Sequence, residues 1–275
     1  MLKSPSTLPR SLAGTISSVI LSAAAAHAAT VTVPFSENFS DTSKTTAAAF
    51  LFTQSVGGLT NIVGSGDARR MQILLSASQN GHVSVDHALT GPNDFTVSSS
   101  ALPYLLDTEA TTAPTIMRFA LVASGTGSNL HTSDAYRVSL DFMAGTVSLL
   151  KGTGTAFTSL AAAFTGNIPT FSPSTPLSMS LAGTYLSATS VLLTGEVSDG
   201  TNTYSFTYTD TDALAGAYYG FHGIKNGTSS GTDTERSRLG VQVDNFQLDV
   251  VPEPSSALLA AAGLFAFSTR RRRQG

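Results

Sequence analysis

VQVDNFQL, residues 241–248, alternates apolar with polar side chains and is the clearest strand signal in the sequence. The same alternation occurs in YRVSLDF, residues 136–142, and in TYSFTY, residues 203–208. A period of two residues is typical of a strand that buries one face. Shorter β-like segments occupy residues 81–85, 116–123, 146–150, 177–181 and 190–197. Short strands separated by Gly, Ser, Asp and Asn predict an all-β fold, an antiparallel β-sandwich.

The middle of the chain reads as one domain, which we place at residues 29–250 of the 275. No repeat is visible, and the Gly- and Ser-rich segments 123–128 and 226–231 are expected to be exposed loops. Only two short segments, 47–52 and 160–164, are candidates for a helical turn. The chain has no cysteine, so disulfides and thiolate metal sites are excluded.

Charge is distributed unevenly along the chain. Away from the two ends only nine basic residues remain, against 18 acidic residues in the whole chain. An acidic domain repels phosphate backbones, so we expect no nucleic-acid partner.

The first 28 residues have the three parts of a secretory signal peptide, with a helical apolar segment. Lys3 and Arg10 supply the positive charge, and an apolar stretch runs from residue 12 to 26. Ala26 and Ala28 place small residues before the cleavage point, which we expect after Ala28, with a second candidate after Ala26. The alternative is a buried N-terminal helix, which would not explain why small residues lead directly into β-like sequence.

Residues 251–275 form a second terminal signal. Pro252-Glu253-Pro254 precedes an uncharged apolar stretch, residues 257–267, and the four arginines Arg270, Arg271, Arg272 and Arg273. The stretch is short for a transmembrane helix, although flanking arginines can snorkel. The order of these parts resembles the PEP-CTERM sorting signal. The resemblance implies a transient inner-membrane anchor, processing near Pro-Glu-Pro by an exosortase-type protease, and a bacterial surface or extracellular location. The alternative is a plain single-pass anchor.

The domain itself resembles concanavalin A-like and laminin-G-like jelly rolls through three segments, residues 35–39, 220–223 and 241–248. That resemblance implies that the first and last strands pair and that a structural Ca2+ can lie near them. Oxygen donors are available on these segments, and Ca2+ takes only oxygen ligands. The candidate ligands are Glu37, Asn38, Asp41, Asp244 and Asn245.

Catalytic patterns are weak in this sequence. Asp107 and Glu109 are the nearest approach to a glycosidase carboxylate pair, and a solvated loop is the simpler interpretation. Residues 227–231 fit G-x-S-x-G, but no helical pattern follows them, as a nucleophile elbow would require. The histidines outside the leader, at positions 82, 87, 131 and 222, are far apart and are interpreted as isolated. Tryptophan is absent, which leaves Tyr104, Tyr218 and Tyr219 as candidate sugar platforms.

The sequence therefore predicts a non-enzymatic exported protein with a structural or adhesive role in the envelope or exopolysaccharide matrix. A lectin-like carbohydrate-binding module is the alternative, and a glycoside hydrolase ranks third. The expected partners are the processing protease, the membrane before processing, and extracellular polysaccharide.

Overall fold

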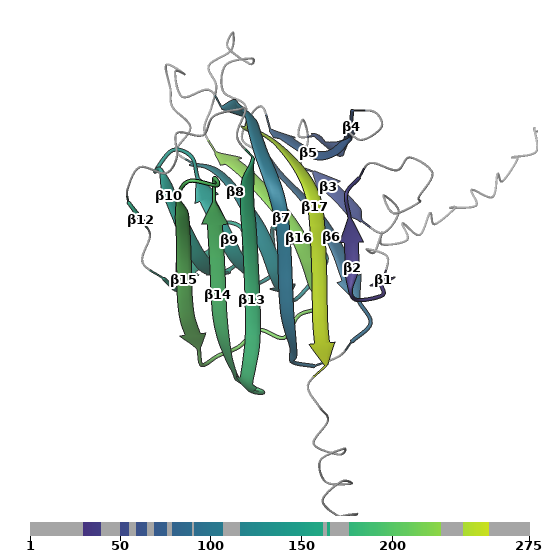
Figure 1. Cartoon of the computed structure of the whole chain (residues 1–275), viewed down its shortest axis with the longest axis vertical. Coiled ribbons are helices and arrows are strands. Elements are labelled where there is room, and N and C mark those ends of the chain that lie inside the picture. Colours follow the sequence, from purple (N-terminus) through teal and green to yellow (C-terminus); the bar gives the residue numbers. More distant parts are fainter. Residues whose placement is uncertain are drawn as a thin grey trace, which may run out of the picture.

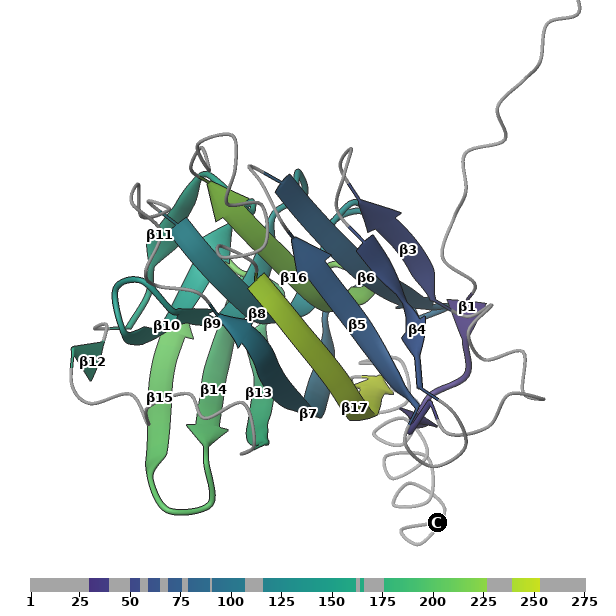
Figure 2. The ribbon, with the colours of Figure 1, turned by 90° about the horizontal axis from the view of Figure 1, so that it is seen from above.

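Two β-sheets pack face to face in the computed structural model (Figures 1 and 2). The structure describes residues 30–39, 50–54, 59–64, 69–75, 79–89, 91–106, 116–161, 164–165, 176–226 and 239–252. These residues form strands and turns and contain no helix. The expected β-sandwich architecture is therefore confirmed at the level of two stacked all-β layers. The expected helices at the two ends of the chain lie outside the described residues.

The first layer, sheet A, has nine strands in the described residues. Its main order is β1-β6-β16-β8-β9-β10-β11, with β3 also paired to β6 and β12 to β10. The strands are β1 (Thr30–Val31), β3 (Leu51–Gln54), β6 (Gln79–His87), β8 (Ile116–Gly125), β9 (Ala135–Asp141), β10 (Thr146–Gly152), β11 (Phe157–Ser159), β12 (Phe164–Thr165) and β16 (Tyr218–Asn226).

The second layer, sheet B, has eight strands in the same ranges, in the order β15-β14-β13-β7-β17-β5-β4 with β2 also paired to β17. The strands are β2 (Phe35–Glu37), β4 (Leu59–Val63), β5 (Arg70–Leu75), β7 (Asn93–Leu106), β13 (Leu177–Ser187), β14 (Ser190–Ser198), β15 (Thr203–Asp210) and β17 (Leu239–Pro252). Pairing in both sheets is antiparallel except between β1 and β6. The expected pairing of an early strand with the last one is confirmed, because Phe35–Glu37 lies against residues 246–248 of β17.

All eight segments predicted as strands lie in or overlap strands of the structure. The helical-turn expectation is wrong where it can be judged, because residues 51–52 belong to β3 and Phe164 to β12. The loop expectation for residues 123–128 is wrong at its start. Ala123 and Ser124 are buried in β8, because Ala123 packs in the core between the sheets and the Ser124 hydroxyl bonds the Leu214 carbonyl and the Gly216 amide.

The core lies between the sheets, where the apolar half of each alternating strand meets its counterpart. Phe246 of β17 is fully buried and packs edge-on against Phe50, Phe35 and Phe221. Each such side chain contributes about 1.5–3 kcal/mol through burial. Gly81 and Gly223 lie opposite each other on β6 and β16. A Cβ at either would approach a side-chain methyl of sheet B to within 3 Å, so glycine permits the sheets to close there.

A polar network ties the two sheets together at one side. Tyr136 of β9 donates its hydroxyl hydrogen to Asp210 Oδ2 of β15 at 2.6 Å. Lys151 of β10 pairs with the same carboxylate at 2.9 Å. Burial and this hydrogen bond raise the pKa of Tyr136 far above its ordinary value. Because the partners come from different layers, the network fixes the position of β15 against sheet A.

Candidate functional site

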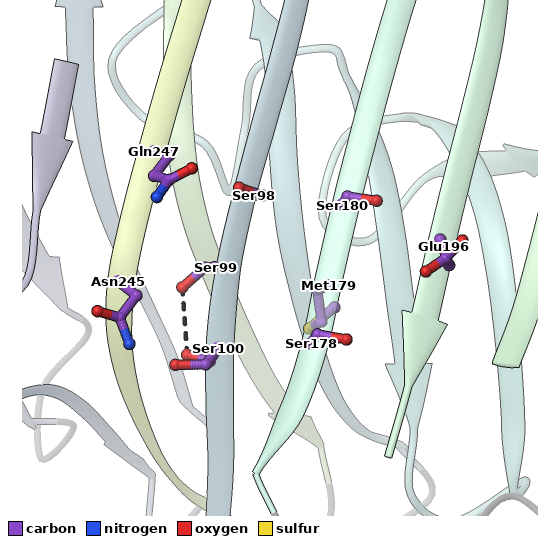
Figure 3. A pocket seen from close by; sticks show the side chains of 9 residues that line it. All are labelled: Ser98, Ser99, Ser100, Ser178, Met179, Ser180, Glu196, Asn245 and Gln247. Atoms are coloured by element: carbon purple, nitrogen blue, oxygen red, sulfur yellow. Dashed lines mark hydrogen bonds between the residues drawn. The ribbon is translucent and has the colours of Figure 1, made fainter. Parts of the chain in front are cut away.

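A shallow hollow of about 340 Å3 opens on the outer face of sheet B (Figure 3). Its lining comes from β7, β13, β14 and β17, the adjoining strands at the front of Figure 1. The lining residues are Ser98, Ser99, Ser100, Ser178, Met179, Ser180, Glu196, Asn245 and Gln247. Most of them carry a hydroxyl or amide group, and Glu196 is the single ionisable side chain in the set.

Strand register explains why these groups meet. Side chains at paired positions point to the same face of a sheet, so a cross-strand row forms wherever each strand places a polar residue outward. Here the row is Gln247, Ser98, Ser180, Glu196 and Ser205. Ser100 and Ser178 are paired in the adjoining row. The serines are short, so the floor of the hollow stays flat and offers both donors and acceptors.

A β-bulge in β17 shapes one wall of the hollow. The register between β17 and β7 shifts between Asp244 and Gln247, and Asn245 adopts a left-handed φ of 52°. Asparagine tolerates this conformation better than most residues. The Asp244 carbonyl freed by the bulge accepts hydrogen bonds from the hydroxyls of Ser99 at 2.8 Å and Ser100 at 3.1 Å. The bulge is thus fastened to β7.

The proposed Ca2+ ligands are only partly brought together. Glu37 pairs opposite Phe246, two residues from Asp244 on β17. However, Glu37 Oε1 accepts a hydrogen bond from the Phe39 amide at 2.6 Å, and Asp244 Oδ2 forms an ion pair with Arg70 at 3.1 Å. Asn38 and Asn245 are exposed. Asp41 lies outside the described residues.

No three His, Cys, Asp or Glu side chains in the described ranges are arranged to hold a metal ion. A bound Ca2+ thus stays a prediction that would require a carboxylate to exchange its present partner for the ion.

Three histidines meet on the outer face of sheet A, which corrects the interpretation of them as isolated. His82 of β6 lies opposite His222 of β16. His131, from the connection between β8 and β9, places its Nδ1 3.0 Å from His222 Nε2. His82 and His222 are both about 98% buried or more. These residues are 49 to 140 positions apart in the chain, so spacing along the sequence holds no sign of the cluster.

Burial keeps the imidazoles of this cluster neutral. Desolvation, and then the charge on His131, lowers the pKa of His82 to about 4. Desolvation, and then the charge of Arg137, lowers the pKa of His222 well below its ordinary value. The pKa of His131 is lowered by the same two causes. His87 lies apart from the cluster, against the ring of Tyr219, and its pKa is also lowered by burial.

The remaining sequence candidates are dispersed or outside the described ranges. Tyr219 is buried in the core and Tyr218 lies on the outer face of sheet A, so the two do not form one sugar platform. Tyr104 is half-buried on β7. The residues outside the described ranges are Asp107, Glu109, residues 227–231, the signal-cleavage alanines Ala26 and Ala28, Glu253, Pro254 and Arg270–Arg273.

A larger hollow, of about 740 Å3, lies beside β10 and β11. Lys151, Asp210 and Asp212 line it, but they are paired with one another at 2.9 and 3.3 Å. Because its one cation, Lys151, is already paired with two carboxylates, we take the hollow on sheet B as the better candidate for a ligand.

The comparisons with known proteins identify the C-terminal segment. Residues 250–273 match the PEP-CTERM protein-sorting motif, which marks an exported protein. The match begins inside β17, whose last residue is Pro252. No helix long and apolar enough to cross a membrane is found in the part of the chain that the structure describes. No match to the chain was found among curated protein sequences.

Solved structures resemble this chain at low sequence identity. Arcelin-5, a lectin-like defense protein from Phaseolus vulgaris, is 10% identical with a TM-score of 0.50, over 80% of this chain and 98% of its own. A protein of unknown function from Shewanella oneidensis MR-1 is 13% identical with a TM-score of 0.49, over 82% and 91%. An endo-beta-1,4-glucuronan lyase from the fungus Trichoderma reesei is 12% identical with a TM-score of 0.47, over 78% and 94%. The likeness is to lectin-like, concanavalin A-like jelly rolls, and these neighbours include lectins as well as polysaccharide lyases.

Proposed function

We propose that this chain is a non-enzymatic exported protein with a structural or adhesive role in the envelope or exopolysaccharide matrix of a bacterium. The observation that carries the role is the open row of hydroxyl, amide and carboxylate groups on the outer face of sheet B. Sugar hydroxyls both donate and accept hydrogen bonds, as serine hydroxyls do. A flat polar strip across several strands suits an extended polysaccharide that touches it at many weak points.

The residues that line the hollow favour binding over catalysis. Glycoside hydrolysis needs two carboxyl groups facing each other across the substrate. Glu196 is the one carboxylate that lines the hollow, and no histidine lines it. The hollow therefore lacks an acid–base pair.

The test of the adhesive role is co-sedimentation of the full-length chain, kept soluble in mild detergent, with exopolysaccharide from its native host. Replacing Ser98 and Ser180 together by valine removes two paired hydroxyls and keeps the β propensity of both strands. We expect binding to weaken about tenfold, as two lost hydrogen bonds imply. Thr194→Val, on the same face of β14 but outside the hollow, is the matched control and should change binding less than about twofold. Equal binding by the double variant and the control would show that the hollow on sheet B does not bind the polysaccharide.

The same hydroxyl row favours a second candidate, a lectin-like module that recognises one oligosaccharide. The two candidates differ in their dependence on ligand length. A structural contact should bind long polymer and leave a tetrasaccharide unbound, whereas a lectin should bind the oligosaccharide nearly as well. A glycan array read with and without Ca2+ separates them and also tests the predicted ion.

Export and sorting are proposed to proceed through cleavage after Ala28, a transient inner-membrane anchor at residues 251–275, and processing by an exosortase-type protease near Pro252–Pro254. The mature chain would then comprise the domain we place at residues 29–250 together with the end of β17. Mass spectrometry of the termini in membrane and extracellular fractions tests this. A mature extracellular chain that keeps the arginine cluster would contradict it.

A further inference from the structure

The connection between β8 and β9, residues 126–134, folds back over the outer face of sheet A, and we call it the roof loop. Leu130 packs on Ala120 and Val122 of β8. Ser84 of β6 donates its hydroxyl hydrogen to the carbonyl of Ser128 at 3.0 Å. The roof loop is therefore attached to β8 and also to β6, a strand that it does not connect.

Polar groups without partners lie beneath this cover. His82, His222, Ala120, Ser139 and Ser148 form one cross-strand row on the outer face. Both ring nitrogens of His82 and the Ser139 hydroxyl are buried and make no hydrogen bond. Burying an unpaired polar group costs about 1–3 kcal/mol, so access of water to this face would remove a free-energy penalty from the folded chain.

Two histidines hold the roof loop at its centre. His131 contacts His222 at 3.0 Å, and the His131 carbonyl accepts a hydrogen bond from the Gly154 amide at 2.8 Å. Gly154 is in direct contact with both rings, since a Cβ there would lie 2.4 Å from His222 Cε1 and 2.8 Å from His131 Nδ1. The ring pair is thus clamped between β16 and the turn that follows β10.

Two arginines lie on the same side of sheet A as the ring pair. Arg137 of β9 is buried and donates to the Leu130 carbonyl at 2.6 Å and to the Ser133 carbonyl at 3.1 Å. Arg118 of β8 faces the same side but is paired with Asp141 of β9 at 3.0 Å. The other ionisable groups on this side are His82 and Asp86 of β6, Tyr218 of β16 and Asp134 of the roof loop. No carboxylate forms an ion pair with either ring in the described residues, so no described ion pair would stabilise a second proton on the ring pair.

We propose that the contact between His131 and His222 is an acid-sensitive latch, which holds the roof loop on sheet A at neutral pH and releases it when the rings are protonated. The hydrogen bond between two imidazoles needs one ring with a free lone pair. Two imidazolium rings can only donate, so neither can accept the hydrogen bond. With their nitrogens 3.0 Å apart the two positive rings repel each other, and the positive charge of Arg137 repels both. Release of the loop hydrates the protonated rings and exposes the polar row beneath them.

The direction of the pH effect follows from linkage. Both rings have lowered pKa values in the closed state and ordinary values once exposed. The open state therefore binds more protons, and acid favours it. The closed state is fully stable above the ordinary histidine pKa and loses stability as pH falls below it.

The test is hydrogen–deuterium exchange of the full-length chain in mild detergent at pH 7.5 and pH 5.0, corrected for the intrinsic change in exchange rate. We expect amides of the roof loop to exchange about tenfold faster at pH 5.0 than at pH 7.5. A tenfold change corresponds to a difference of about one unit between the histidine pKa values of the closed and open states. Amides in β9 should stay protected. His222→Gln keeps a hydrogen-bonding side chain that does not titrate, and should reduce the response to less than about twofold. His87→Gln, away from the latch, should respond as the unmodified chain does.

Three results would overturn the proposal. One is a roof loop whose corrected exchange does not change with pH. Another is an acid response of equal size in His222→Gln. The third is acid exchange that rises equally in all strands, which would mean general acid unfolding. If His222→Gln fails to fold by circular dichroism, His131→Gln is measured in its place, because it removes the same contact from the loop side.

Discussion

The outer faces of the two sheets are built by the same alternation of side chains and yet differ in what they can do. On sheet B the outward serines of β7 and β13 stay open to solvent. On sheet A the outward side chains include His82, His222 and Arg137, and all three are buried. The difference arises from two connections on sheet A, the roof loop and the turn after β10, which contact these side chains, whereas the hollow on sheet B is open.

Covering a polar face changes the chemistry of its groups. Neutral hydroxyls on the open face exchange water for a ligand at little cost. Histidines and arginine under the roof loop lose hydration, so their protonation becomes coupled to folding. The open face is thus suited to binding and the covered face to sensing pH.

The largest expected effect on stability comes from Arg137→Met, which removes the buried guanidinium from the covered face of sheet A. Arg137 donates to the carbonyls of Leu130, Ser133, Ala135 and Gly152, and methionine leaves these groups without a donor. We expect a loss of about 3 kcal/mol in the free energy of unfolding, measured by urea denaturation. Ser180→Ala on the open face is the comparison variant and should stay within about 0.5 kcal/mol. A loss below about 1 kcal/mol for Arg137→Met would mean that water already reaches these carbonyls.

The next effect is the pH dependence of stability. His82 has a pKa of about 4 in the folded chain against an ordinary 6.5, so the unfolded chain takes up its proton first as pH falls. From His82 alone we expect about 2 kcal/mol of unfolding free energy to be lost between pH 7.5 and pH 5. Asp210, whose pKa is lowered, contributes only below this window. His82→Gln should remove about this part of the pH dependence of the unfolding free energy, while the lowered pKa values of His131 and His222 keep a remainder. A pH dependence that His82→Gln leaves unchanged would show that His82 is hydrated.

Sequence reasoning predicted the clearly alternating strands and, from shorter β-like segments, parts of β6, β8, β10, β13 and β14, but it missed β7. β9, β15 and most of β17 were predicted because their apolar residues repeat every second position. β7 was missed although it is the central strand of its sheet, because residues 98–100 are three serines and Pro103 normally marks an edge or a bulge. In the structure Pro103 lies opposite Val241, at a register irregularity of β17.

The functional features were harder to predict than the strands. The sorting tail is a local motif, so it could be read directly. The serine row depends on the register of five strands, and the histidine cluster depends on which strands become neighbours. The signal of this row in the sequence is the dense serine pattern SSS at 98–100 with S-M-S at 178–180, which does not by itself show that the two segments are neighbours.

A smaller effect is expected from Gly154→Ala, which tests how tightly the turn after β10 packs against the rings of His131 and His222. The added methyl would overlap the rings of His131 and His222, so the turn after β10 must move away. We expect a loss of about 1–2 kcal/mol and faster amide exchange in the roof loop already at pH 7.5. Thr155→Ala, at the exposed neighbouring position, controls for the turn and should have no such effect.

The smallest effect on stability is expected where sheet B passes into the sorting tail. A chain ending at Pro252 keeps β17 complete, and its unfolding free energy should match that of the full chain within about 0.5 kcal/mol. A chain ending at Val250 also loses Val251 and Pro252, which pair with Asp94 and Asn93 of β7. We expect it to fold with up to about 1 kcal/mol less stability, because only the end of one strand is lost. Both truncations should disappear from the membrane fraction of the native host. If ending the chain at Pro252 unfolded the domain, the tail would belong to the fold of sheet B, and the open face could not be treated as independent of sorting.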